Sequence, residues 1–166
     1  MTPELDQLTA YGTELLTACR EQLATLRVTR FGPVQASGRT AAAMRVEVSD
    51  TPTGYRLQLF APGSILTLIY GRQPGKFPNL LAIEQWIADK GIVPHPDKNG
   101  KSISTKSLAY LIGRKIKNEG NTVFKQGPPS ILFADLLGGA NVSAAIKARI
   151  VPLLVQQVMS TLHQAA

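Results

Sequence analysis

The sequence has little of what metal sites, disulfide frameworks and membrane spans require. A single cysteine, Cys19, in 166 residues excludes an internal disulfide framework and a zinc site built from cysteines. Two histidines, His95 and His163, leave little for a His-rich metal site. No uninterrupted apolar run approaches the roughly 20 residues that span a bilayer. Glu4 and Asp6 stand where a signal peptide carries bases. These features favour a soluble protein of a reducing cytoplasm, with no cofactor and no membrane partner.

Charge is scarce but unevenly placed. Only 17% of the residues are charged and 44% are hydrophobic, which is enough apolar material for a folded core. The net charge is +7, from 18 bases and 11 acids. Residues 1–50 carry five bases and six acids, whereas residues 51–166 carry thirteen bases and five acids. The densest stretch, 98–125, has seven bases against Glu119 alone. A basic balance of this kind permits binding to a polyanion or to an acidic protein surface.

The apolar periodicity predicts one α+β domain over residues 1–166. We expect a long N-terminal helix (1–30, with the periodic positions at 4–26), an α+β core at 36–137 and a C-terminal helix at 141–166. Pro152 lacks an N–H group and is expected to kink or split this last helix.

Within the core, alternation at Ala42, Met44, Val46 and Val48 predicts the first strand of an antiparallel hairpin. A five-residue turn, Asp50 to Gly54, leads to the second strand. Residues 65–70 fit either a strand or a helical turn. Helices are expected from Pro78 or Asn79 to Lys90, from Ser107 to Glu119 with Leu108, Leu111 and Ile112 on one face, and over 131–137, with loops at 92–106 and 121–129.

Three motifs suggest catalysis or ligand binding and fail on inspection. The loop Gly71 to Lys76 has one residue too few for a Walker phosphate loop, and Phe77 follows where Ser or Thr is needed. The segment 97–100 begins like a calcium loop but has no closing glutamate. His95 and Asp97 could serve a small hydrolase with a nearby serine, yet no nucleophile elbow is present. Cys19 falls on an apolar helix face and is expected in the core. The sequence therefore predicts no enzyme.

The basic stretch is the one charged feature above background. Lys106, Arg114 and Lys117 can share a helix face opposite Leu108, Leu111 and Ile112. Such a face is either solvated or a contact surface for a polyanion or an acidic protein. Only Tyr110 and Phe124 lie nearby in sequence, which argues against a stacking platform for single-stranded nucleic acid.

An ordered set of segments resembles a known family. These are Ala36-Ser37-Gly38 before a strand and hairpin, GRQPGKFP at 71–78, IEQWIADKGI at 83–92 and SLAYLIGRKIKNEG at 107–120. In order and spacing they resemble the neck and tail-completion (head–tail joining) proteins of tailed bacteriophages. The similarity covers residues 36–137, about three-fifths of the chain.

The resemblance implies a structural virion protein made in the host bacterial cytoplasm, without enzyme activity or cofactor. It implies a homo-oligomeric ring at the neck that contacts portal, adaptor or head-closure proteins on one side and tail tube or terminator proteins on the other, with genomic DNA passing through. A tail terminator or head-closure protein and a basic double-stranded DNA-binding protein remain alternatives. The candidate interface residues are loop and basic-face residues: Arg72, Lys76, Lys101, Lys106, Arg114 and Lys117.

Overall fold

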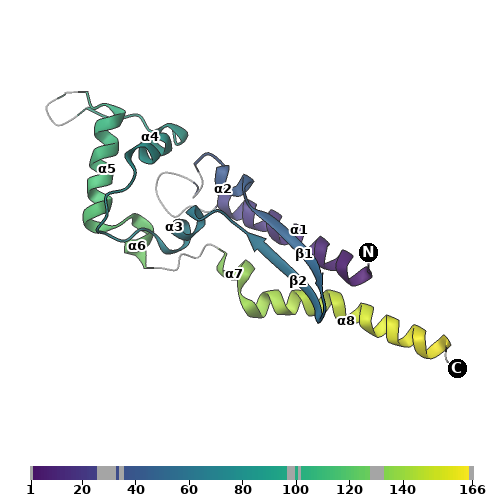
Figure 1. Ribbon diagram of the computed structural model, residues 1–166. Coiled ribbons are helices and arrows are strands. Elements are labelled where there is room, and N and C mark those ends of the chain that lie inside the picture. Colours follow the sequence, from purple (N-terminus) through teal and green to yellow (C-terminus); the bar gives the residue numbers. More distant parts are fainter. Residues whose placement is uncertain are drawn as a thin grey trace. The chain divides into compact units, whose positions relative to one another are not determined.

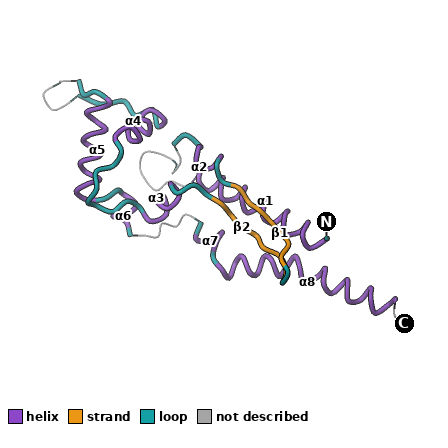
Figure 2. Tube along the Cα trace, in the orientation of Figure 1, coloured by secondary structure: helices purple, strands orange, loops and turns teal. Residues whose placement is uncertain are grey.

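The computed structural model describes residues 2–25, 33, 36–96, 100, 102–127 and 133–164. It is an α+β structure with a long N-terminal helix, an antiparallel hairpin and a helical C-terminal half, as predicted (Figures 1 and 2). The elements are α1 (Pro3–Thr25), α2 (Arg39–Ala42), β1 (Arg45–Thr51), β2 (Gly54–Phe60), α3 (Ser64–Tyr70), α4 (Leu80–Asp89), α5 (Thr105–Glu119), α6 (Thr122–Gln126), α7 (Ala134–Leu137) and α8 (Gly139–Gln164).

Contacts divide the chain into two compact units. Unit 1 comprises 1–22, 43–62 and 133–166, and unit 2 comprises 23–42 and 63–132. This division differs from the predicted segments, because the hairpin groups with the first and last helices rather than with the 36–137 core.

The hairpin of unit 1 is tighter than expected. Its ladder runs from Arg45 opposite Phe60 to Thr51 opposite Gly54, which leaves a two-residue turn. The predicted five-residue turn is therefore wrong. The ladder continues to its end because the Thr51 hydroxyl donates a 2.8 Å hydrogen bond to the Gly54 carbonyl. The predicted start of the first strand is also wrong, since Ala42 closes α2 by donating its N–H to the Gly38 carbonyl.

Helix α1 buries one side within unit 1 and meets α8 with another. Its buried side chains include Leu8, Tyr11, Leu15 and Cys19, which confirms Cys19 as a core residue. Gly12 faces Val46 and Leu57 of the hairpin, so the helix passes close to the sheet at that point.

Helices α1 and α8 run antiparallel. Gln157 of α8 donates a hydrogen bond to Glu4, and Arg149 pairs with Glu14. The Arg149 guanidinium also lies 4.7 Å from the centre of the Tyr11 ring. Late residues of α8 thus meet early residues of α1, and the sequence did not predict these contacts.

Helix α8 is continuous through Pro152, so it is not split there. Its stretch Gly139–Ser160 is long and apolar enough to cross a membrane, with a mean hydropathy of 1.3 and none of that window buried. The sequence expectation counted only uninterrupted apolar residues, and Lys147 and Arg149 interrupt this stretch. Length and composition alone are weak evidence for a membrane span.

Unit 2 is built on the packing of α4 against α5. Ile83, Ile87 and Ala109 are buried between these helices, and partly buried apolar side chains surround them: Leu80, Trp86, Ile92, Leu108, Ile112 and Ile116. The Asn79 side chain caps α4, and the Ser104 side chain caps α5, which begins at Thr105, two residues before the expected start.

Two further segments of unit 2 are helical. Residues 65–70 lie in α3, which settles the alternative left open by the sequence. The predicted loop 121–129 contains α6 instead, because the Asn121 side chain accepts the Phe124 N–H and caps a helical turn. Helix α6 packs against α3.

Candidate functional site

The loop 71–78 is fastened to the C-terminal end of α5. The Gly75 N–H donates a 2.7 Å hydrogen bond to the carbonyl of Lys117, one of the last carbonyls of the helix. Arg72 and Asn121 exchange two hydrogen bonds, from Arg72 N–H to Asn121 Oδ1 (2.9 Å) and from Asn121 N–H to the Arg72 carbonyl (3.0 Å). Two segments about 45 residues apart in sequence are therefore held together.

Gly71 makes this attachment possible. Its φ of +74° lies in the region that side chains disfavour. A β-carbon there would stand 2.3 Å from the backbone nitrogen of Phe124 and 2.7 Å from Asn121 Oδ1. Backbone atoms cannot move aside as a flexible side chain can, so this position requires glycine.

An aromatic pair lies on the same surface. Phe77 stacks on Tyr110 of α5, with ring centres 5.7 Å apart and ring planes 28° apart. Phe77 also packs over Gly113, where a β-carbon would stand 2.7 Å from its ring. Phe77 and Tyr110 both remain partly exposed. This pair is not predictable from local sequence pattern, because the two residues are 33 positions apart and meet only through the loop–helix attachment.

Five of the six candidate bases lie in this part of unit 2. Arg72 and Lys76 are on the loop, and Lys106, Arg114 and Lys117 are on α5. At 100° per residue the three α5 bases fall within about 80° of each other around the helix, as predicted. Lys101 lies outside the described residues. We call the group Arg72, Lys76, Lys106, Arg114 and Lys117 the basic surface.

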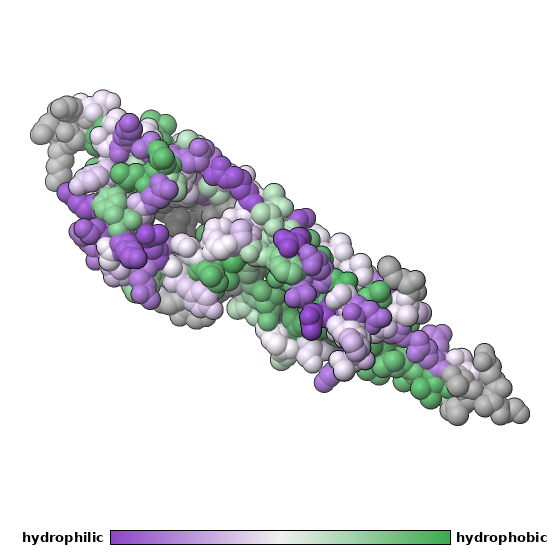
Figure 3. Space-filling view, viewed as in Figure 1, coloured by the Kyte–Doolittle hydropathy of each residue, from purple (hydrophilic) through white to green (hydrophobic). Residues whose placement is uncertain are grey.

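No acid pairs with the basic surface within the described ranges of the chain. The described acids of unit 2 that form ion pairs are engaged elsewhere: Asp89 with Arg39 at 2.9 Å, and Glu119 with Lys125. The hydrogen bond from Lys125 lowers the pKa of Glu119, with a smaller contribution from the charge of Lys115. Within the described residues, the positive charge of the basic surface is therefore not neutralised by an ion pair. Hydrophilic side chains gather over this part of the molecule in Figure 3.

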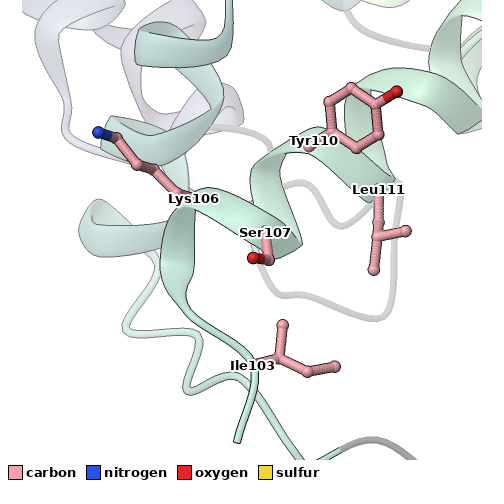
Figure 4. A pocket seen from close by; sticks show the side chains of 5 residues that line it. All are labelled: Ile103, Lys106, Ser107, Tyr110 and Leu111. Atoms are coloured by element: carbon pink, nitrogen blue, oxygen red, sulfur yellow. The ribbon is translucent and has the colours of Figure 1, made fainter.

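A shallow groove opens beside the basic surface at the start of α5. It has a volume of about 490 Å³ and is lined by Ile103, Lys106, Ser107, Tyr110 and Leu111 (Figure 4). Leu111 was predicted to share an apolar face with Leu108 and Ile112, but it is exposed here while those two pack on the core. It lies about 100° from Ile112 around the helix, beyond the reach of α4.

His95 and His163 are exposed, and Asp97 lies outside the described residues. Burial raises the pKa of the Cys19 thiol to about 11, which makes it inert at neutral pH. Among the residues that the structure describes, no three His, Cys, Asp or Glu side chains gather as a metal site would require.

Comparison with known proteins was made against family models, curated proteins and solved structures. None of the three yields a match. The similarity to phage neck proteins thus rests on the segments quoted above, and the function that it implies stays a prediction.

Proposed function

We propose that this chain is a structural subunit of the head–tail junction of a tailed bacteriophage, where it forms a ring and joins or completes the tail. The observation that carries the proposal is the loop–helix attachment. Three of the segments that resemble the family (71–78, 83–92 and 107–120) belong to one unit. A backbone hydrogen bond from Gly75 to Lys117 joins the first to the third, and Ile83 and Ile87 of the second pack with Ala109 of the third.

The basic surface is the proposed contact with the neighbouring layer of the neck. Unpaired bases on a rigid helix and an attached loop suit an acidic protein surface. Protein is a better partner than the genome here, because tight contacts to every passing phosphate would impede DNA transit. A ring arises from a head-to-tail contact that closes by rotation. Tail terminator and head-closure proteins occupy adjacent layers and share these requirements.

Double-stranded DNA binding is the second candidate, and the same unpaired bases favour it. A protein that neutralises five phosphates releases counterions, so its affinity falls steeply with salt. A surface that serves to bind an acidic protein is not expected to bind free duplex DNA tightly.

Negative-stain electron microscopy of the purified protein at high concentration tests the proposal. We expect rings of uniform diameter, because a closed head-to-tail contact fixes the number of subunits. A labelled duplex titrated at 50 and 200 mM salt is the parallel measurement, and weak binding at both is expected. Dispersed small particles together with tight, salt-sensitive duplex binding would overturn the neck assignment in favour of DNA binding.

A further inference from the structure

Helix α8 has an inner face that is already occupied. The residues with reduced exposure recur at steps of three and four: Val142, Ala145, Ile146, Arg149, Ile150 and Leu153. Arg149 and Gln157 on this side hold the helix to α1 through Glu14 and Glu4. One side of α8 is therefore fixed within unit 1.

The opposite side of α8 is apolar and exposed. At 100° per residue, Val151, Leu154, Val155 and Val158 centre about 160° away from this inner face. Their exposed fractions lie between 47% and 58%, and that of the neighbouring Met159 is 54%. Figure 3 shows hydrophobic surface on this part of the molecule. No charged residue occurs between Ile150 and Leu162.

The N-terminal half of the same side carries small residues. This half carries three exposed alanines, Ala140, Ala144 and Ala148. They lie on the same side of the helix as Val151, Val155 and Met159 of the C-terminal half. We call these six positions the outer face. Small residues occupy one half of it and large residues the other.

This arrangement is complementary to itself. If two α8 helices lie antiparallel and centred between positions 149 and 150, the numbers of facing residues add to 299. Ala140 then meets Met159, Ala144 meets Val155 and Ala148 meets Val151, each pair twice. Each of the three large side chains of the outer face thus faces an alanine, which is how facing surfaces interdigitate without clashes or voids.

We propose that two copies of this chain pair through the outer faces of α8, antiparallel about a two-fold axis between positions 149 and 150. A two-fold contact uses the same patch on both copies. The one charge near the outer face, Lys147, falls opposite Pro152, where its long side chain can reach solvent at the edge of the contact.

The exposed area suits a weak dimer. The three large side chains of the outer face, together with the adjacent Leu154 and Val158, offer roughly 300–400 Å² of apolar surface per copy. A specific interface needs about 1,000 Å² in total. The pair reaches that size only if the whole stretch from Ala140 to Met159, about 29 Å long, is engaged. We expect a dissociation constant on the order of micromolar.

A bilayer fits the outer face less well than a second copy. Lys147 and Arg149 lie at the middle of the Gly139–Ser160 stretch, where each charge costs roughly 2.5–3.5 kcal/mol in a membrane. Arg149 is also committed to Glu14 and Tyr11, so the inner face would have to leave unit 1 first.

The pairing does not depend on the proposed neck function. A two-fold contact closes after two copies and cannot propagate a ring, so a ring must use another surface. Under the proposed neck function, the dimer is either the state of the subunit before assembly or a contact that joins two rings face to face.

Sedimentation equilibrium of the full chain tests the pairing with matched variants. The wild-type chain should be a dimer at 50 μM. Val155→Asp places a charge in the contact and should weaken the dimer by at least about 100-fold. Gln156→Asp adds the same charge to the same helix, on the side away from the outer face, and should leave the dimer unchanged. Circular dichroism confirms that both variants keep their helix content.

Disulfide trapping tests the orientation. Chains of different mass carrying Ala140→Cys and Met159→Cys are mixed and oxidised with copper phenanthroline. Antiparallel pairing predicts a crosslinked heterodimer, and little crosslinking of either variant alone, because identical positions lie about 28 Å apart along the axis. The native Cys19 is fully buried and is not expected to form crosslinks.

Three outcomes would overturn the pairing. They are a wild-type chain that stays monomeric at 50 μM, equal effects of the two aspartate variants, and crosslinking of each cysteine variant with itself. A monomer that floats with vesicles of phosphatidylglycerol and phosphatidylethanolamine would assign the outer face to a bilayer instead. Rings that form normally with Val155→Asp would leave the neck proposal standing, while dimers without rings would leave the pairing standing.

Discussion

Gly71→Ala is expected to lower the free energy of unfolding of unit 2 by at least about 3 kcal/mol. The new β-carbon would meet the backbone of Phe124 at 2.3 Å, and the residue would keep a φ of +74° that alanine disfavours. The loop must therefore move away from α5 and α6, and the hydrogen bonds of Arg72 and Gly75 are lost with it. Urea unfolding followed by tryptophan fluorescence measures the change, because the single tryptophan, Trp86, lies in α4.

Alanine substitutions at two other glycines show how much of the Gly71→Ala effect comes from the steric clash and how much from the unfavourable φ. Gly75 has a φ of +122° but open space around it, so Gly75→Ala should cost only about 1 kcal/mol. Gly63 has an ordinary φ of −58° and open space, so Gly63→Ala should change stability by less than about 0.5 kcal/mol. Equal stability of all three variants would mean that the loop is not attached as described.

The proposed neck contact predicts that reversing Lys106, Arg114 and Lys117 together to glutamate abolishes assembly on the connector. The variant would present three acids to an acidic partner, so an attractive surface becomes a repulsive one. The fold should survive, because all three side chains are exposed and no ion pair holds them in the described part of the chain. Lys106 also stands in the first turn of α5, where an acid suits the helix dipole better than a base.

The measurement is incorporation of the variant into particles, by immunoblot of purified virions, with a charge-matched control. Arg45, Arg56 and Lys115 are exposed bases outside both the basic surface and the outer face of α8. Reversing those three also takes the net charge from +7 to +1, since each reversal changes it by two. The control should assemble normally. Normal incorporation of the first variant, or equal failure of both, would show that the basic surface is not the contact.

Local pattern sufficed to predict the elements that are fixed locally. Helices α1, α4 and α5 follow from apolar spacing, and the Gly120 stop of α5 was expected. The end of the hairpin and helix α6 were missed because one side-chain hydrogen bond decides each. The Thr51 hydroxyl extends the ladder, and Asn121 caps a helix directly after Gly120. An asparagine after a stop glycine is the signal that could have indicated α6.

The candidate site was predictable in composition but not in arrangement. A count of charges identifies the bases of α5, and helical spacing places them on one face. The approach of Arg72, Lys76 and Phe77 to that face depends on the contacts of Gly71 and Asn121, which join distant segments. The outer face of α8 also required the structure, because the sequence is apolar on both sides of this helix and only the contacts with α1 show which side is occupied.

Inactivation of the gene that encodes this chain tests the proposed neck function most directly. Lysates are examined by electron microscopy with and without the wild-type chain supplied in trans. A head–tail joining protein predicts DNA-filled heads and complete tails that lie unjoined, and joined infectious particles once the chain is restored. Joined particles at wild-type number in its absence would contradict the proposed function.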